Sequence, residues 1–196
     1  MNEHKQCFKQ NKDPFIQWLV GTLGPVILGV KPSEIMSFKM NDATTNEKIK
    51  KIEETFSICK HISYKISYYN GTSIKVLFYN VKSLEKTLKE PRNLKFLASI
   101  GYPKKFSLNF FLNHLISKIN LGIIPTEIGV FLGYPLKDVI GFMGHPSLKL
   151  TKVNGWRIYG DSRISDQRYE EFLQAKKKIR DLLTINNPST ILAITS

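Results

Sequence analysis

The segment from Ile62 to Asn80, ISYKISYYNGTSIKVLFYN, constrains the fold most, because it reads as a β-hairpin with a definable register. Apolar side chains alternate along both arms: Tyr64, Ile66 and Tyr68, then Ile74, Val76 and Phe78. A two-residue turn at Asn70-Gly71 would pair Ile66 with Lys75 and place the two apolar sets on opposite faces, since a slip of one residue turns every side chain over. An odd-numbered loop centred on Gly71 pairs Ile66 with Val76, Tyr68 with Ile74 and Tyr64 with Phe78. We therefore expect a loop of about three or five residues.

Helical patterns flank this hairpin on both sides. Helices are predicted from Pro14 to about Leu23, after a Thr44-x-x-Glu47 capping box, from Val81 to Lys89, after Ser107 as a cap, and after Ser165 as a cap. The helix after Thr44 is amphipathic, with apolar residues at helical spacing: Ile49, Ile52, Phe56 and Cys59. A short segment from Ile35 to Met40 is a further strand candidate.

A second hairpin signal, LKLTKVNGWRIYG, turns at Asn154-Gly155. Strand alternation directs Trp156 and Ile158 to the core and leaves Arg157 and Tyr159 outward. Helices separate the two hairpins, and no βαβ repeat is evident. The predicted fold is α+β: several helices packed on a small, mainly antiparallel sheet built from two hairpins. We expect a loose segment over 1–13, a single domain over 14–187 and a C-terminal tail over 188–196.

The charge of the chain favours an anionic partner. Lys and Arg number 29 against 16 Asp and Glu, which gives a formal net charge of +13. Such an excess attracts nucleic acid, acidic proteins or anionic membranes. The cations are mostly lysines spread along the chain, however, and the sequence is rich in Ile and Asn, so a compositional origin of the charge stays open.

Cysteine use and hydropathy point to the cytoplasm. Cys7 and Cys59 make neither a disulfide framework nor a zinc site, and we expect both to be reduced. The apolar stretch from Phe15 to Val30 is interrupted by Gly24-Pro25 and is shorter than the roughly 20 residues of a spanning helix. We therefore expect a buried first helix and no membrane span.

The stretch EIGVFLGYPLKDVIGFMGH, from Glu127 to His145, has the steric pattern of a helix-turn-helix, with Gly129, Gly133 and Val139 at the diagnostic spacing. Its expected buried positions are all apolar: Ile128, Leu132, Tyr134, Val139 and Phe142. The outward positions of the second helix, however, are Leu136, Lys137, Ile140 and Gly141, of which only Lys137 suits DNA. We favour a structural helical corner, with a DNA-reading unit as the alternative.

The carboxylates of this stretch, Glu127 and Asp138, are its candidate acid–base groups. Each lies near the start of a predicted helix, so capping is the simpler interpretation. His114 could face Glu127 from the preceding helix. Arg157 and Tyr159 could stack a base or a flat cofactor. The candidate ligand-binding residues are His114, Glu127, Tyr134, Lys137, Asp138, Arg157 and Tyr159.

Recognised catalytic and metal-binding motifs are missing from the sequence: it has no HExxH, P-loop, GxGxxG or GxSxG pattern. We predict no metal site, and no particular cofactor is indicated.

Two motifs carry a family resemblance. PTEIGVFLGYPLKDVIGFMG, followed by GWRIYGD, resembles the signature of a bacterial family catalogued as domain-of-unknown-function family 3793. The earlier segments GPVILGVKPSEI, VLFYNVKSLEKTL and FLASIGYP occur in the order of that family, so the resemblance covers nearly the whole chain. Family members often carry His directly before Glu-Ile-Gly, where this chain has Thr126. The resemblance implies membership and no particular activity.

These observations lead to a non-catalytic cytoplasmic binding or adaptor protein for an acidic partner, either protein or nucleic acid. One alternative is an enzyme or cofactor-binding protein, which requires His114, Glu127, Tyr134 and Asp138 to line one cavity. Another is a helix-turn-helix DNA-binding protein. A third is a structural component of an assembly, with an apolar patch around Leu136 and Ile140. The sequence indicates no oligomeric state.

Overall fold

The computed structural model describes residues 13–57, 59 and 61–194. Its helices are α1 (Pro14–Thr22), α2 (Gly24–Ile27), α3 (Thr45–Phe56), α4 (Val81–Lys89), α5 (Pro91–Ser99), α6 (Leu108–Asn120), α7 (Ile128–Phe131), α8 (Leu136–Phe142), α9 (Arg163–Ile185) and α10 (Pro188–Ile194). Its strands are β1 (Ser33–Lys39), β2 (Ile62–Tyr69), β3 (Ser73–Asn80), β4 (Leu150–Asn154) and β5 (Trp156–Tyr159). The α+β class is confirmed.

The first hairpin has the predicted register. Ile66 pairs with Val76, Tyr68 with Ile74 and Tyr64 with Phe78 in the antiparallel β2–β3 ladder. Tyr69 pairs with Ser73, which leaves the three-residue loop Asn70-Gly71-Thr72. Strand β1 adds to the other edge of β3, so β3 is the central strand in the order β1-β3-β2.

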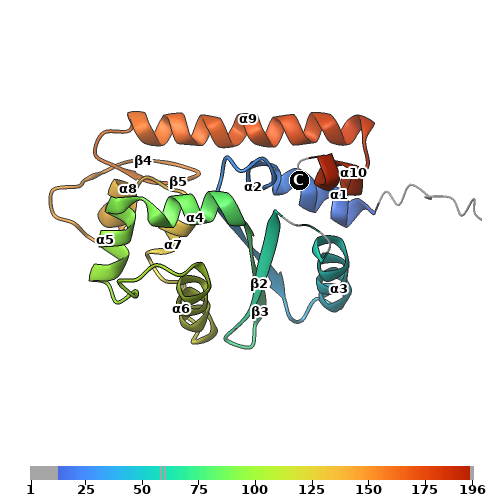
Figure 1. Cartoon of the computed structure of the whole chain (residues 1–196), viewed down its shortest axis with the longest axis horizontal. Coiled ribbons are helices and arrows are strands. Elements are labelled where there is room, and N and C mark those ends of the chain that lie inside the picture. Colours follow the sequence, from blue (N-terminus) through green and yellow to red (C-terminus); the bar gives the residue numbers. More distant parts are fainter. Residues whose placement is uncertain (1–12, 58, 60, 195–196) are drawn as a thin grey trace, which may run out of the picture.

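Both faces of the three-stranded sheet are covered. Val76 and Phe78 of β3 belong to a core formed with α1, α2, α3, the C-terminal half of α9 and α10. Leu77 and Tyr79 point the other way, into a core formed with α4, α5, α6 and α7. Figure 1 shows α3 and α6 on opposite sides of this sheet, with α9 running along one edge of the molecule. Leu77 and Tyr79, which lie on the face opposite to the predicted alternating positions, are therefore also buried, because β3 lies between two layers of helices.

The second hairpin does not join the first sheet. Strands β4 and β5 form a separate two-stranded antiparallel sheet. Trp156 and Ile158 are buried and Arg157 is exposed, as predicted, whereas Tyr159 is half-buried. Trp156 and Ile158 pack with Phe172 of α9, so α9 supplies the apolar cover that a shared sheet would otherwise have provided.

Helix capping follows the prediction at some positions only. The Asp13 carboxylate accepts hydrogen bonds from the backbone N–H groups of Phe15 and Ile16, as expected for the start of α1. The Thr44 capping box is wrong, because the Thr44 hydroxyl donates to Asp42 Oδ1 and α3 has no side-chain cap. Ser107 likewise makes no capping bond.

The long helix α9 differs from its predicted start. It begins at Arg163 after Ser162, so Ser165 lies inside the first turn and is not the cap. Ser165 is fully buried because its hydroxyl is used in a tertiary contact, described below. At the other end of the chain, the segment predicted to be a tail contains α10, whose Ile191 and Leu192 are buried. Within the described residues, no helix combines the length and hydropathy needed to cross a membrane.

Glycine residues allow α7 and α8 to pack closely at the corner that the two helices form. A Cβ atom on Gly129 would lie 2.8 Å from Val139 Cγ2, which explains the small residue predicted at this position. Gly133 turns the chain at φ 78°, a left-handed conformation. Ile128, Leu132 and Val139 are buried as predicted. The prediction for Phe142 is wrong: its side chain is 46% exposed because it ends α8, beyond the packed corner.

Replacing Gly133 by Ala should destabilise the protein by more than the backbone strain alone. The new Cβ would lie 2.4 Å from Pro32 Cδ, in addition to adopting a positive φ. Gly144→Ala is the matched control, because Gly144 has φ 95° and a Cβ added there would have no atom within 4 Å. We expect a cost of about 1–2 kcal/mol at Gly144 and about 1–3 kcal/mol more at Gly133, measured by urea unfolding. Equal costs at both positions would contradict the close contact with Pro32.

Candidate functional site

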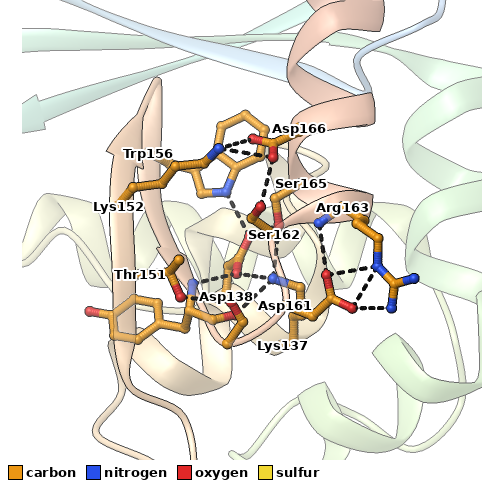
Figure 2. Close-up of polar contacts among 12 residues, drawn as sticks. Lys137, Asp138, Thr151, Lys152, Trp156, Asp161, Ser162, Arg163, Ser165 and Asp166 are labelled. Carbon is orange, nitrogen blue, oxygen red and sulfur yellow. Dashed lines mark hydrogen bonds and ion pairs between the residues drawn. The ribbon is translucent and has the colours of Figure 1, made fainter.

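Asp138, in the first turn of α8, is the most highly bonded side chain of the predicted site. It is 2% exposed, and each of its carboxylate oxygens accepts two hydrogen bonds. Oδ1 accepts from Lys137 Nζ at 2.6 Å and from the backbone N–H of Tyr159 at 2.9 Å. Oδ2 accepts from Trp156 Nε1 at 2.8 Å and from Ser165 Oγ at 2.6 Å. Figure 2 shows these donors converging on the carboxylate from α8, β5 and α9.

Lys137 completes this network. Its ammonium group also donates to the Tyr159 carbonyl at 2.8 Å and to Ser165 Oγ at 2.9 Å. The buried negative charge of Asp138 thus has an adjacent positive charge and a full set of donors, which is the condition under which a buried carboxylate is tolerated. The capping interpretation of Asp138 is wrong, because α8 has no side-chain cap and the carboxylate binds β5 and α9 instead.

Glu127 belongs to a second, separate network. Its buried carboxylate accepts from Tyr102 OH at 3.1 Å and from Lys118 Nζ at 2.5 Å. Burial, followed by the charge of Glu127 and the hydrogen bond to it, raises the pKa of the Tyr102 hydroxyl far above its ordinary value. Glu127 makes no capping bond to α7, so its capping interpretation is wrong as well.

His114 reaches this second network through an aromatic contact. Its ring centroid lies 4.4 Å from that of Tyr102. His114 Nε2 is buried and has no hydrogen-bond partner among the described residues. His114 and Glu127 thus each contact Tyr102, and no hydrogen bond or ion pair joins the two directly within the described residues.

The two carboxylates therefore do not form a pair. Tyr134 and Asp138 line a cavity of about 200 Å³, together with Thr126, Trp156 and Arg157. Glu127 and His114 are not among the residues that line it. The four residues named for an enzyme pocket consequently occupy two environments and do not share one cavity.

Arg157 and Tyr159 lie on the same strand, β5, but their side chains pack at different places. The Arg157 guanidinium lies over the Phe142 ring, 5.5 Å from its centroid. The Tyr159 ring covers Gly141, where an added Cβ would be 2.4 Å from Tyr159 Cγ. Each side chain thus packs against α8, and the two do not form one stacking platform.

A larger concavity lies between α4, the start of α5, the α7–α8 turn and the start of α9. We call it the α4–α9 groove; its volume is about 1220 Å³. The ionisable side chains that line it are mostly basic: Lys82, Lys86, Lys89, Arg92, Lys137 and Arg168, against Glu90 as the carboxylate. Lys137 is held by Asp138, Lys89 by Glu85 and Arg168 by Glu171. Lys82, Lys86 and Arg92 form no ion pair with any residue that the structure describes.

Sequence reasoning missed this groove. Lys82, Lys86 and Lys89 are spaced so that they lie along one side of a helix. This spacing is the sequence pattern that could have indicated one wall of the groove. That spacing alone could not show that α9 and the α7–α8 turn form the opposite wall. Within the described part of the chain, no cluster of three or more potential metal ligands occurs.

Replacing Asp138 by Asn should strongly destabilise the fold. The amide NH₂ group would face hydrogen-bond donors, and the Lys137 ammonium would lose its counter-charge. We expect a loss of about 3 kcal/mol or more in the free energy of unfolding, measured by urea denaturation. Asp161→Asn is the matched control, because Asp161 is exposed and pairs with Arg163 at the surface. That control should change stability little, and a comparable loss there would refute the special role of Asp138.

Deprotonation of the Tyr134 hydroxyl should lower the free energy of unfolding at alkaline pH. Burial, helped by the charge of Glu34, raises the pKa of Tyr134 from 10.0 to about 12. A group whose pKa is higher in the folded than in the unfolded protein contributes to the free energy of unfolding. This contribution is complete below the pKa of the unfolded protein and is lost as the pH rises through the pKa of the folded protein. Between pH 10 and 12, Tyr134→Phe should therefore lose less stability than the parent, by up to about 2 kcal/mol. Parallel pH curves of the unfolding free energy for the two proteins would contradict this assignment.

Comparisons with known proteins yield one match. No curated protein and no solved structure matches this chain. The family model described as "Protein of unknown function (DUF3793)" matches residues 19–193, which span α1 to α10 and include both carboxylate networks and the groove. The chain therefore belongs to the DUF3793 family.

Proposed function

We propose that this protein is a non-catalytic binding protein that takes a polyanionic partner into the α4–α9 groove. The observation that carries this proposal is the set of cations without ion pairs to other described residues, Lys82, Lys86 and Arg92, on the wall of a concave surface. A concave surface lined by one sign of charge concentrates counter-ions more strongly than the same charges on a flat face. The net charge of +13 adds attraction at longer range.

The chemistry of the groove suits charge recognition more than base recognition. Lysine acts as a point charge, which fits phosphate or carboxylate groups without requiring a defined geometry. Cations outnumber aromatic rings among the lining residues, since Tyr134 is the aromatic residue there and one face of its ring is stacked on Trp156 at 4.5 Å. Phosphates of nucleic acid and carboxylates of an acidic protein share this chemistry. We place the interaction in the cytoplasm, in keeping with the free thiol of Cys59.

A catalytic role is less well supported by the same geometry. Asp138 has no free acceptor position, and Glu127 is bound by Tyr102 and Lys118 away from the cavity. A helix-turn-helix role is less well supported too. Helix α8 spans only Leu136–Phe142, and the ammonium of Lys137 is held by Asp138, Ser165 and the Tyr159 carbonyl. The helix thus has no free basic face for a DNA groove.

The proposal is tested by fluorescence anisotropy with a labelled DNA duplex, a labelled single strand and a labelled poly-glutamate peptide. The double variant Lys82→Glu/Lys86→Glu reverses two exposed groove cations. Affinity for the bound polyanion should fall at least about tenfold at about 50 mM salt, and the slope of log affinity against log salt should fall by about 2. The three probes distinguish nucleic acid from acidic protein.

The matched control is Lys177→Glu/Lys178→Glu, which makes the same charge change at exposed positions of α9 outside the groove. It should retain affinity within about threefold, because only long-range attraction changes. Equal losses in both double variants would show that overall charge, and not the groove, determines binding. Failure of all three probes to bind the parent protein at about 50 mM salt would reject the proposed function.

A further inference from the structure

The cavity lined by Tyr134 and Asp138 has walls of a different character from those of the groove. Most of its lining is apolar or aromatic: Ile128, Gly129, Tyr134, Val139, Phe142 and Trp156. The Tyr134 and Trp156 rings are stacked on each other with an angle of 15° between their planes. Gly129 keeps the backbone of α7 close to Val139 and Tyr134, because a Cβ there would approach both side chains within 3.2 Å. The α7–α8 corner and β5 thus enclose a small aromatic pocket.

Its size limits the ligand to a small ring. The volume is about 200 Å³. An apolar cavity of about 150 Å³ holds benzene, so this pocket accommodates one six-membered ring with a short substituent. Aromatic walls favour a flat, aromatic ligand through stacked or edge-on ring contacts.

The polar groups of the pocket indicate which charge the substituent of a bound ligand would carry. Asp138 contributes no free acceptor, since its four hydrogen bonds come from protein donors and Lys137 balances its charge. Arg157 is exposed, and its guanidinium lies over the Phe142 ring without a hydrogen bond or ion pair to any described residue. The Thr126 hydroxyl is likewise unbonded within the described part of the chain. Among the lining side chains, the donors without a hydrogen bond to any described residue are therefore the Arg157 guanidinium and the hydroxyls of Thr126 and Tyr134.

We propose that this pocket binds a small aromatic monocarboxylate, with the ring among Tyr134, Phe142 and Trp156 and the carboxylate on Arg157. A guanidinium binds a carboxylate through two parallel N–H···O bonds, and the apolar rim beside it lowers the competition from water. Apart from Tyr134, none of these residues lines the α4–α9 groove, so this site is distinct from the proposed polyanion site.

Trp156 provides a direct optical signal for the test. The chain contains two tryptophans, and Trp18 is 52% exposed on α1, so Trp18→Phe isolates the fluorescence of Trp156 with little risk to the fold. Titration of this background variant with benzoate should give a saturable change in fluorescence, with a Kd of about 1 mM or tighter for a ligand of this size. Benzylamine, which has the same ring and the opposite charge, should give no saturable change.

Arg157→Gln, added to the same background, should weaken benzoate binding at least about tenfold, because it removes a charge-assisted contact. The affinity for uncharged benzyl alcohol should stay within about twofold of the affinity of the parent, since Arg157 contributes charge and not the ring contacts. Arg157 is exposed on β5, so the melting temperature of the variant should match that of the parent. Lys149→Gln, an exposed neutralisation next to the same hairpin, should leave benzoate binding unchanged.

Three results would overturn the proposal. One is the absence of a saturable benzoate signal in the folded parent. Another is unchanged benzoate affinity in Arg157→Gln. The third is benzylamine binding as tight as benzoate binding, which would mean that the pocket selects the ring alone.

Discussion

The Asp138 carboxylate is the interaction on which the C-terminal half of the structure depends. It joins three elements that are distant in the chain, because its donors come from α8, from Trp156 and Tyr159 of β5, and from Ser165 of α9. A two-stranded sheet is marginally stable by itself. The β4–β5 hairpin is fixed by this carboxylate and by the packing of Trp156 and Ile158 against Phe172. The position of β5 in turn defines one wall of the aromatic pocket, and the start of α9 defines one wall of the α4–α9 groove.

The parts of the fold that could be predicted are those set by local spacing. The alternation of Tyr64, Ile66 and Tyr68 against Ile74, Val76 and Phe78 favours a single register, and the structure has it. The glycine–valine spacing of the α7–α8 corner is also readable, because two helices can approach so closely only where one lacks a side chain. Both patterns are short-range consequences of backbone geometry.

The sequence is misleading where a side chain has a tertiary partner that spacing cannot reveal. Its local pattern favours Ser165 as the cap of α9, but the Ser165 hydroxyl reaches Asp138, 27 residues earlier in the chain. Glu127 and Asp138 lie where carboxylates cap helices, and each instead neutralises a lysine inside the protein. A local pattern predicts that a polar group needs a partner, but the choice among partners is made by the tertiary fold. For the same reason the groove could not be found, since its walls come from α4 and α9.

Lysine therefore occurs in two different environments in this chain, which the net charge alone does not distinguish. Lys118 and Lys137 compensate the buried carboxylates Glu127 and Asp138, and this positive charge is not available to a partner. Lys82 and Lys86 remain exposed in the groove without ion pairs to other described residues. A compositional bias toward lysine would distribute charge without regard to shape. Other lysines without ion pairs to described residues, among them Lys104, Lys105 and Lys177, lie outside the groove. The position of Lys82, Lys86 and Arg92 in a concavity, and not the number of such cations, is therefore what favours the attraction of anions to this surface.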